Sequence, residues 1–333
     1  MTPIKDCLIN KNKNINPIWI MRQAGRYLPE FREIRKSNPN FIKLCLNPDL
    51  SKEITLQPIK RFGFDAAVIF SDILMVPYGI GQTVEFKKNF GPKLGDLNND
   101  ILDNVSEKEF TDNLAPVYEL LQKLKNDPNL IGRDLIGFVG APWTLMVYMI
   151  NKVSPKNGLK GDFFGNELLI NKLLKTLDRF IKLHIKNQVE SGASIIQIFD
   201  SWAGLINDEF DKFLYNPTKS IVNYTKELGV PVICFPRNIK DYPKFCKIVN
   251  PDVISIDYNT DPRSVIKKIS IPVQGGLDPN ILLTDKKNLK QKVREYLKIF
   301  DNHPYIFNLG HGILPTTEID MVEELVKIVR EFK

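Results

Sequence analysis

The chain has 333 residues, 43% of them hydrophobic, which predicts a folded protein with a large core and argues against a disordered one. The formal net charge is +7, but the lysines are scattered along amphipathic segments, so we expect no nucleic-acid partner. No apolar run approaches membrane-spanning length, and the N-terminal residues lack a signal-peptide core. We therefore expect a cytoplasmic protein with no membrane partner.

The cysteines give no sign of a metal site. Cys7, Cys45, Cys234 and Cys246 are far apart in sequence and show no metal-ligand spacing. We expect reduced structural thiols, no metal and no cofactor.

Short apolar runs alternate with segments of helical periodicity along the chain. The predicted strands are residues 17–21, 66–70, 135–139, 194–199, 232–235, 253–256, 271–274 and 305–309. The main helical segments are 48–61, 106–126, 163–191, 207–228, 241–249, 261–269, 283–300 and 317–331, and residues 82–100 predict an inserted hairpin. Eight strand–helix units favour an α/β fold, a closed (β/α)₈ TIM barrel, over an open sheet. No change in composition marks a linker, so we expect one domain, residues 1–333.

The segment from Met21 to Arg35 is rich in arginine and follows the first predicted strand. Arg22 and Arg26 fall in the loop at the carboxyl end of that strand, beside Gly25, which allows close approach of the backbone to a ligand. Guanidinium groups there suit carboxylates or phosphates. The alternative is a solvated basic loop. A small polyanionic substrate is the sharper interpretation.

Other polar residues also follow predicted strands. In a barrel, the carboxyl ends of all strands lie on one face, which is where active sites are built. This shared position is the main physical argument for an enzyme, and the residues concerned are Arg22, Arg26, Ser71, Asp72, Ser201 and His311.

Three segments resemble the uroporphyrinogen decarboxylase family of haem biosynthesis. They are PIWIMRQAGRYLPEFREIR near the start, GFVGAPWTLMVYMI at 137–150 and NLGHGILPTT at 308–317, with weaker matches at 69–74, 198–205 and 275–279. The resemblance implies a distorted (β/α)₈ barrel, a homodimer with facing clefts, and removal of CO₂ from the four acetates of uroporphyrinogen III without metal or prosthetic group.

The resemblance also implies roles for residues in those motifs. Asp72 corresponds to the carboxylate that receives the pyrrole N–H groups, Arg22 to an acetate-binding residue and proton donor, and Tyr148 to a group that orders Asp72 or the reacting acetate. Arg26 and Arg35 correspond to carboxylate clamps. The other substrate contacts implied are Gln23, Ala24, Gly25, Ser201 and His311.

Alternative interpretations remain for single residues and for the whole chain. Tyr148 lies in an apolar segment and would otherwise be taken as core, and His184 and His303 are expected to be structural. A related cobalamin-linked methyltransferase would need a His-x-Cys zinc cluster, but no cysteine lies within three residues of a histidine. A non-catalytic tetrapyrrole-binding barrel is the other alternative.

Overall fold

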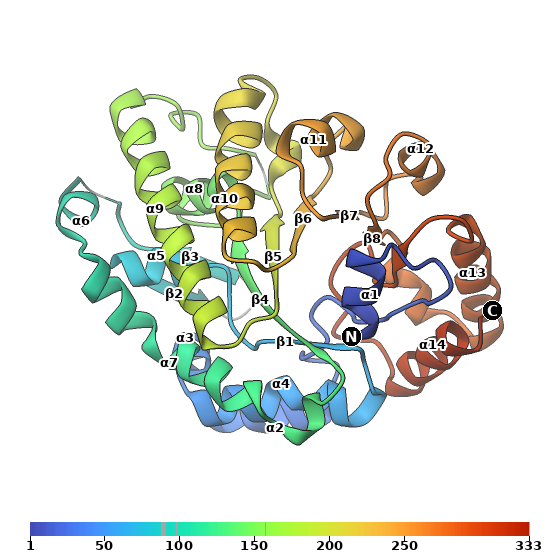
Figure 1. Ribbon diagram of the computed structural model, residues 1–333. Helices are drawn as coiled ribbons and strands as arrows, with labels where there is room; N and C mark the ends of the chain where they lie inside the picture. Colours follow the sequence, from blue (N-terminus) through green and yellow to red (C-terminus); the bar gives the residue numbers. More distant parts are fainter. Residues whose placement is uncertain (88–90, 98, 157, 333) are drawn as a thin grey trace.

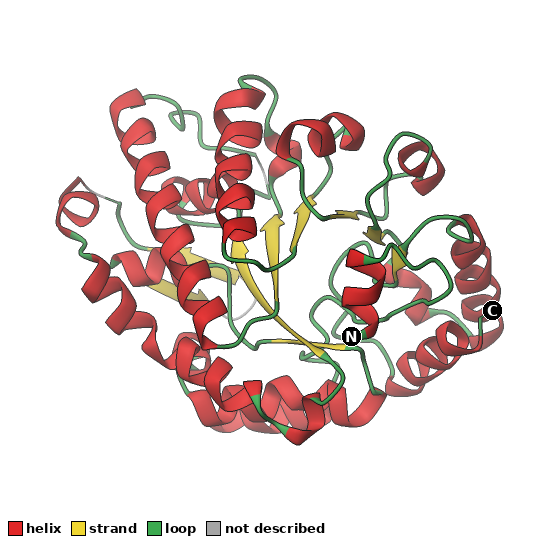
Figure 2. Ribbon diagram, viewed as in Figure 1, coloured by secondary structure: helices red, strands yellow, loops and turns green. Residues whose placement is uncertain are grey.

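Seven parallel strands form a curved sheet at the centre of the molecule, and helices surround it (Figure 1, Figure 2). The computed structural model describes residues 1–87, 91–97, 99–156 and 158–332. The strand order is β1-β4-β5-β6-β7-β8-β9. The bounds are β1 Ala66–Val68, β4 Asp134–Gly140, β5 Ile195–Asp200, β6 Val232–Pro236, β7 Val253–Ile256, β8 Val273–Gly275 and β9 Tyr305–Ile306. The order follows the sequence, as expected for a (β/α) barrel.

The predicted first strand, residues 17–21, is not a regular strand. Ile18 forms only an isolated parallel bridge with Phe307, just beyond β9, and its carbonyl accepts from the Asp65 N–H, just before β1. Three backbone N–H groups of this segment donate to side-chain oxygens and not to the backbone of a neighbouring strand. Ile18 donates to Asp65 Oδ2, Ile20 to Gln23 Oε1 and Met21 to Asn308 Oδ1. The segment therefore joins the two edges of the sheet without adding a regular eighth strand.

The inserted hairpin predicted within residues 82–100 is confirmed. Strands β2 (Val84–Lys87) and β3 (Gly91–Leu94) pair antiparallel, and residues 88–90 and 98 lie outside the described part of the chain. Leu94 N–H donates to the Lys152 carbonyl, and Lys93 bridges to Val153. The hairpin is thus attached to the loop that follows the apolar helix 142–151.

The helices cover the outside of the sheet, and most begin and end within a few residues of their predicted bounds. Ser106 and Glu109 form a capping box at the start of α7, and Gly192 ends α9. The segment predicted as helix 207–228 instead has a π-helical turn at Asp211–Tyr215 before α10. Pro217 lacks the N–H that would continue the α-helical pattern backward, which accounts for the difference. The bounds are α1 Pro3–Ile9, α2 Pro29–Ser37, α3 Phe41–Cys45, α4 Pro48–Phe62, α5 Met75–Ile80, α6 Asn99–Asn104, α7 Glu107–Lys125, α8 Pro142–Asn151, α9 Glu167–Ser191, α10 Asn216–Glu227, α11 Tyr242–Val249, α12 Pro262–Ile266, α13 Lys286–Ile299 and α14 Ile319–Glu331.

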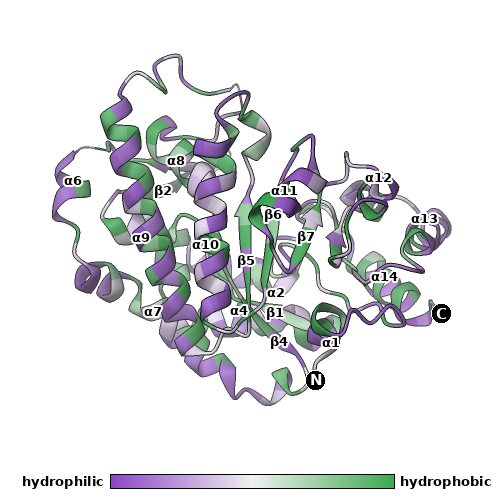
Figure 3. Cartoon of the chain, turned by 45° about the horizontal axis from the view of Figure 1, so that its top comes forward, coloured by the Kyte–Doolittle hydropathy of each residue, from purple (hydrophilic) through white to green (hydrophobic). Residues whose placement is uncertain are grey.

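Two apolar layers form the core. The larger layer packs helices against the outside of the sheet, and the helices accordingly show hydrophobic and hydrophilic stripes (Figure 3). The smaller layer fills the barrel interior with Trp19, Met21 and strand residues. Helix α1 covers its floor with Ile4, Cys7 and Leu8. No helix in the described residues is both long and apolar enough to cross a membrane.

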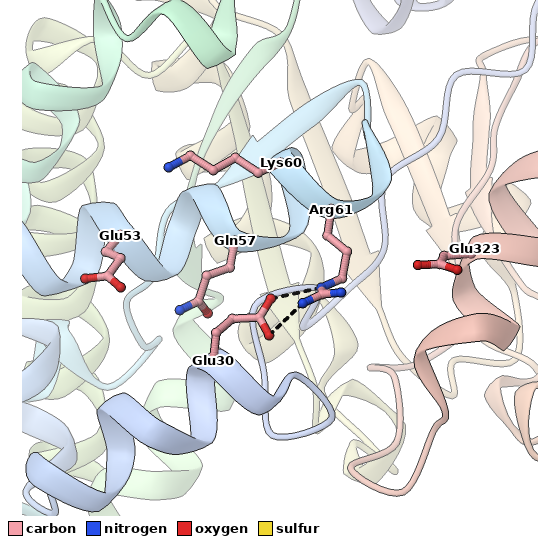
Figure 4. Close-up of a pocket in the computed structure, with 6 residues that line it drawn as sticks. All are labelled: Glu30, Glu53, Gln57, Lys60, Arg61 and Glu323. Atoms are coloured by element: carbon pink, nitrogen blue, oxygen red, sulfur yellow. Dashed lines mark hydrogen bonds and ion pairs between the residues drawn. The ribbon is translucent and has the colours of Figure 1, made fainter.

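A hollow on the outer surface lies between α2, α4 and α14 (Figure 4). Arg61 on α4 donates from Nε and Nη2 to the two carboxylate oxygens of Glu30 on α2, at 3.0 and 3.1 Å. This two-point contact fixes α2, the helix that follows the arginine loop. The remaining lining residues are Glu53, Gln57, Lys60 and Glu323.

Candidate active site

Arg22 lies in a tight turn at the mouth of the barrel. The Gln23 N–H donates to the Ile20 carbonyl at 2.9 Å and closes the turn. Arg22 has a φ of +64°, a left-handed conformation that costs a non-glycine residue about 1 kcal/mol. Surrounding contacts hold the turn in place, since Asn308 accepts from Met21 N–H and Ile313 N–H donates to the Met21 carbonyl. Strain of this kind is frequent at functional sites.

The side chain of Arg22 crosses the mouth toward the loop after β9. A Cβ placed on Gly312 would come within 2.3 Å of Arg22 Cδ, so glycine is required for this close approach. The Arg22 side chain is accessible to solvent, yet it lies deep enough that desolvation lowers its pKa. A side chain that solvent reaches but that protein atoms surround on most sides lies in a concave surface, and Arg22 meets both conditions. The negative charge of Asp72 acts in the opposite direction and favours the charged guanidinium.

Asp72 lies in the loop after β1 and is the carboxylate of this site. Its Oδ1 accepts from the Leu74 N–H at 2.9 Å, which fixes the loop into α5. Burial raises the pKa of Asp72 to about 6, while the Leu74 hydrogen bond and the charge of Arg22 lower it. The carboxylate is thus ionised at neutral pH, but in surroundings that stabilise the charge poorly.

Tyr148 lies on α8 and reaches the same site. Burial raises the pKa of its hydroxyl, and the charges of Asp72 and Arg22 both act on it. Its ring contacts Trp202 edge-on, with 6.0 Å between centroids. Tyr148 is therefore buried, as a core residue would be, and also belongs to the polar site.

A buried hydrogen-bonded pair fixes α8 to the loop after β5. Thr144 Oγ1, one helical turn before Tyr148, donates to Asp200 Oδ1 at 2.6 Å and accepts from the Trp202 N–H at 3.0 Å. Burial raises the pKa of Asp200 to about 7. This pair sets the position of Tyr148 relative to Ser201, which is half-buried beside Trp202.

His311 approaches from the loop after β9. Burial, together with the charges of Arg22 and Arg237, lowers its pKa to about 4, so the imidazole is neutral at pH 7. Arg237, directly after β6, was missed by the sequence reasoning, although its place after a predicted strand was the same signal that selected Asp72. Among the described residues, Arg22, Arg26 and Arg237 form no ion pair, whereas many other basic side chains do.

The remaining residues expected in the site fall into two groups. Arg26 is exposed near Arg22. Arg35 is half-buried on α2, where burial and the nearby charge of Arg26 lower its pKa. Its guanidinium donates to the Asn38 carbonyl and stacks over Phe41. Gln23 is buried, and its amide bonds Ile20 N–H and the Ala66 carbonyl, so it braces the turn. Ala24 and Gly25 are half-buried beside it.

The structure gives no candidate metal centre. No group of three or more His, Cys, Asp or Glu side chains with suitable placement occurs in the described residues. All four cysteines are free and buried, as expected of structural thiols. The site that remains has the Asp72 carboxylate beside Arg22, and Arg22 is in turn close to Arg26, to Arg237 and to the neutral imidazole of His311. This arrangement has excess positive charge and suits a substrate with several carboxylates.

Comparison with known proteins identifies the relatives of this chain. The family model described as uroporphyrinogen decarboxylase (URO-D) matches residues 3–332. A uroporphyrinogen decarboxylase of Rickettsia bellii is 43% identical, covering 98% of this chain and 97% of the relative, and one of Rickettsia africae is 41% identical over 97% and 95%. The chain belongs to the uroporphyrinogen decarboxylase family. The resemblance read from the three motifs is thereby confirmed.

A solved structure agrees with the barrel fold of this family member. A methyltransferase from Methanosarcina mazei superposes with a TM-score of 0.76, covering 99% of this chain and 97% of that one. Its sequence identity is 16%, so the likeness concerns the fold alone. The (β/α) barrel prediction is confirmed, with the correction that residues 17–21 do not form a regular strand.

Proposed function

We propose that this protein is a carboxy-lyase that removes CO₂ from the four acetate side chains of uroporphyrinogen III and gives coproporphyrinogen III. The observation that carries the proposal is the cluster of Arg22, Arg26 and Arg237, whose guanidinium groups have no ion-pair partner among the described residues and in which Arg22 lies beside the carboxylate of Asp72. The chain that carries this cluster is 43% and 41% identical to two proteins named uroporphyrinogen decarboxylase. An octacarboxylate needs many cations, and a reaction through a cationic ring needs one fixed anion.

The chemistry sets three requirements. Loss of CO₂ from an acetate on a pyrrole would leave a carbanion unless the ring is first protonated at carbon. The protonated ring then accepts the electron pair of the breaking C–C bond as CO₂ leaves. The resulting methylene carbon takes up a proton to become a methyl group, and the ring carbon releases the proton that it took up first, which restores the pyrrole. The protein must bind carboxylates, stabilise the cationic ring, and allow proton transfer.

The residues of the site can meet these requirements. Asp72 accepts hydrogen bonds from the pyrrole N–H groups, and this interaction becomes stronger as the ring becomes cationic. Arg22 binds the reacting acetate and takes part in proton transfer, which its pKa, lowered by desolvation, makes easier than for an exposed arginine. Tyr148 orients the acetate, and Arg26, Arg35, Ser201 and His311 bind the other carboxylates, with backbone contacts from residues 23–25.

We further propose a cytoplasmic homodimer that works without metal or cofactor. Sedimentation of the purified protein at several concentrations tests the dimer. A concentration-independent monomer would contradict it.

The activity is tested by incubating the purified protein with uroporphyrinogen III under reducing conditions and separating the oxidised products by chromatography. We expect the seven-, six- and five-carboxylate intermediates and then coproporphyrin. Tight binding without loss of carboxylates would favour the non-catalytic alternative. If the protein neither binds nor converts uroporphyrinogen III, the proposal is overturned.

A further inference from the structure

Arg237 occupies a position in the barrel mouth that the backbone fixes from three sides. Its N–H donates to the Asp200 carbonyl at 3.1 Å, and its carbonyl accepts from Gly204 N–H at 3.0 Å. The N–H of the next residue, Asn238, donates to Asp257 Oδ2 at 2.8 Å. A Cβ on Gly204 would lie 2.6 Å from Asn238 Cβ, so only glycine allows the two loops to pack this closely. The loops after β5, β6 and β7 thus hold Arg237 jointly.

Although three loops fix its backbone, the side chain of Arg237 has no ion-pair partner among the described residues. Its Nε is buried without a hydrogen bond, and the described residues supply it with no carboxylate. Its charge also disfavours the charged forms of Arg22 and His311 and so lies close to both. A half-buried guanidinium without a counter-ion, next to another cation, destabilises the free protein. Such a group is usually kept for an anionic ligand.

We propose that Arg237 binds, together with His311, a substrate carboxylate that stays on the tetrapyrrole during the reaction. This rests on the proposed function. The loop that carries His311 packs against the β7 loop that holds Arg237, because a Cβ on Gly310 would lie 2.3 Å from the Tyr258 N atom. Strands β4 and β5 separate β6, which precedes Arg237, from β1, which precedes Asp72. The ligand of Arg237 therefore lies beside the reaction centre and not at the bond that breaks. The guanidinium of Arg237 carries five N–H donors in one plane, which suits a carboxylate, and the neutral imidazole of His311 supplies a further donor next to it.

The test compares Arg237→Gln with Arg237→Lys and with a matched control, Lys240→Gln, in the same loop. Lys240 is exposed and lies three residues after Arg237. Because one charge-assisted contact is lost equally from ground and transition states, Arg237→Gln should raise KM at least about tenfold with kcat little changed. Arg237→Lys should recover part of the loss, since it restores the charge without the fork. Lys240→Gln should behave as wild type.

Two further measurements separate this inference from the proposed function. Binding of uroporphyrin, the stable oxidised macrocycle with the same carboxylates, is followed by quenching of tryptophan fluorescence, and melting temperature is measured on every variant. If the wild type is active and Arg237→Gln keeps the wild-type KM and uroporphyrin affinity, the role of Arg237 is overturned and the proposed function stands. A lower melting temperature with unchanged KM would also overturn it, in favour of a structural role. An inactive wild type would overturn the proposed function.

Discussion

Arg22 combines a long cationic side chain with a backbone conformation that glycine adopts more easily. Replacing it with glycine or alanine removes the guanidinium in both cases, but only glycine relieves the strain at φ +64°. We expect both variants to lose turnover more than substrate affinity. Arg22→Gly should be more stable than Arg22→Ala by about 1 kcal/mol in denaturant unfolding. Equal stability would show that the turn relaxes when arginine is removed.

Asp72 should show a conflict between activity and stability. Asp72→Asn keeps the volume and an acceptor for Leu74 N–H but removes the charge that the cationic ring requires, so turnover should fall on the order of 10²-fold or more. Circular dichroism should remain that of the wild type. Turnover near the wild-type level would remove Asp72 from the mechanism.

The same variant should be more stable than the wild type at pH 8. The pKa of Asp72 is raised to about 6 in the folded protein from an ordinary value of 3.8, so the folded state binds the proton more tightly than the unfolded state. Its contribution to stability is present below about pH 4 and is lost as pH rises through 6. The melting-temperature difference between Asp72→Asn and wild type should therefore be larger at pH 8 than at pH 4. A constant difference would contradict this account.

At this scale, sequence reasoning found the residues whose types and positions after strands stand out. Arg22, Asp72 and His311 were named in advance, and the structure brings them together with Tyr148. Arg237 also follows a predicted strand, but it was missed because its neighbours in sequence, Pro236 and Asn238, carry no motif that draws attention to it. Its unpaired state depends on which acids lie nearby in space. That information is absent from a single strand–loop segment.

Among the elements, α8 depends on the buried Thr144–Asp200 pair for its position. Thr144→Val keeps the shape but removes the hydroxyl that donates to Asp200 Oδ1 and leaves the Trp202 N–H unpaired, at a cost of about 1–3 kcal/mol. We expect a lower melting temperature and, because Tyr148 is one turn further along α8, a lower kcat. Thr144→Ser is the matched control and should retain both properties. Normal turnover in the destabilised Val variant would limit the pair to a structural role.

The element boundaries show where periodicity is a reliable guide and where it is not. Strands 135–139 and 232–235 were predicted within a residue or two because their apolar runs are continuous. Residues 17–21 are equally apolar, but distant side chains, Asp65 and Asn308, take the backbone N–H groups there. Hydrophobicity predicted burial correctly, but it could not predict which partner satisfies each backbone group.

At the scale of the whole molecule, we expect activity without a metal. Prolonged dialysis against a chelator should leave kcat and KM unchanged, because the arginines and Asp72 supply the charges that the reaction needs. A matched sample dialysed without chelator serves as the control. Activity that is lost and then restored by added zinc would contradict this expectation.

The contact between Ile18 and Phe307 also has a consequence for how the chain folds during synthesis. The segment around Ile18 leaves the ribosome long before its bridge partner Phe307 and the sheet edge formed by β9. Helix α1 must likewise wait for β9, which it packs against. The apolar residues of both segments therefore stay exposed through most of translation, which favours aggregation and makes closure of the ring a late, slow step.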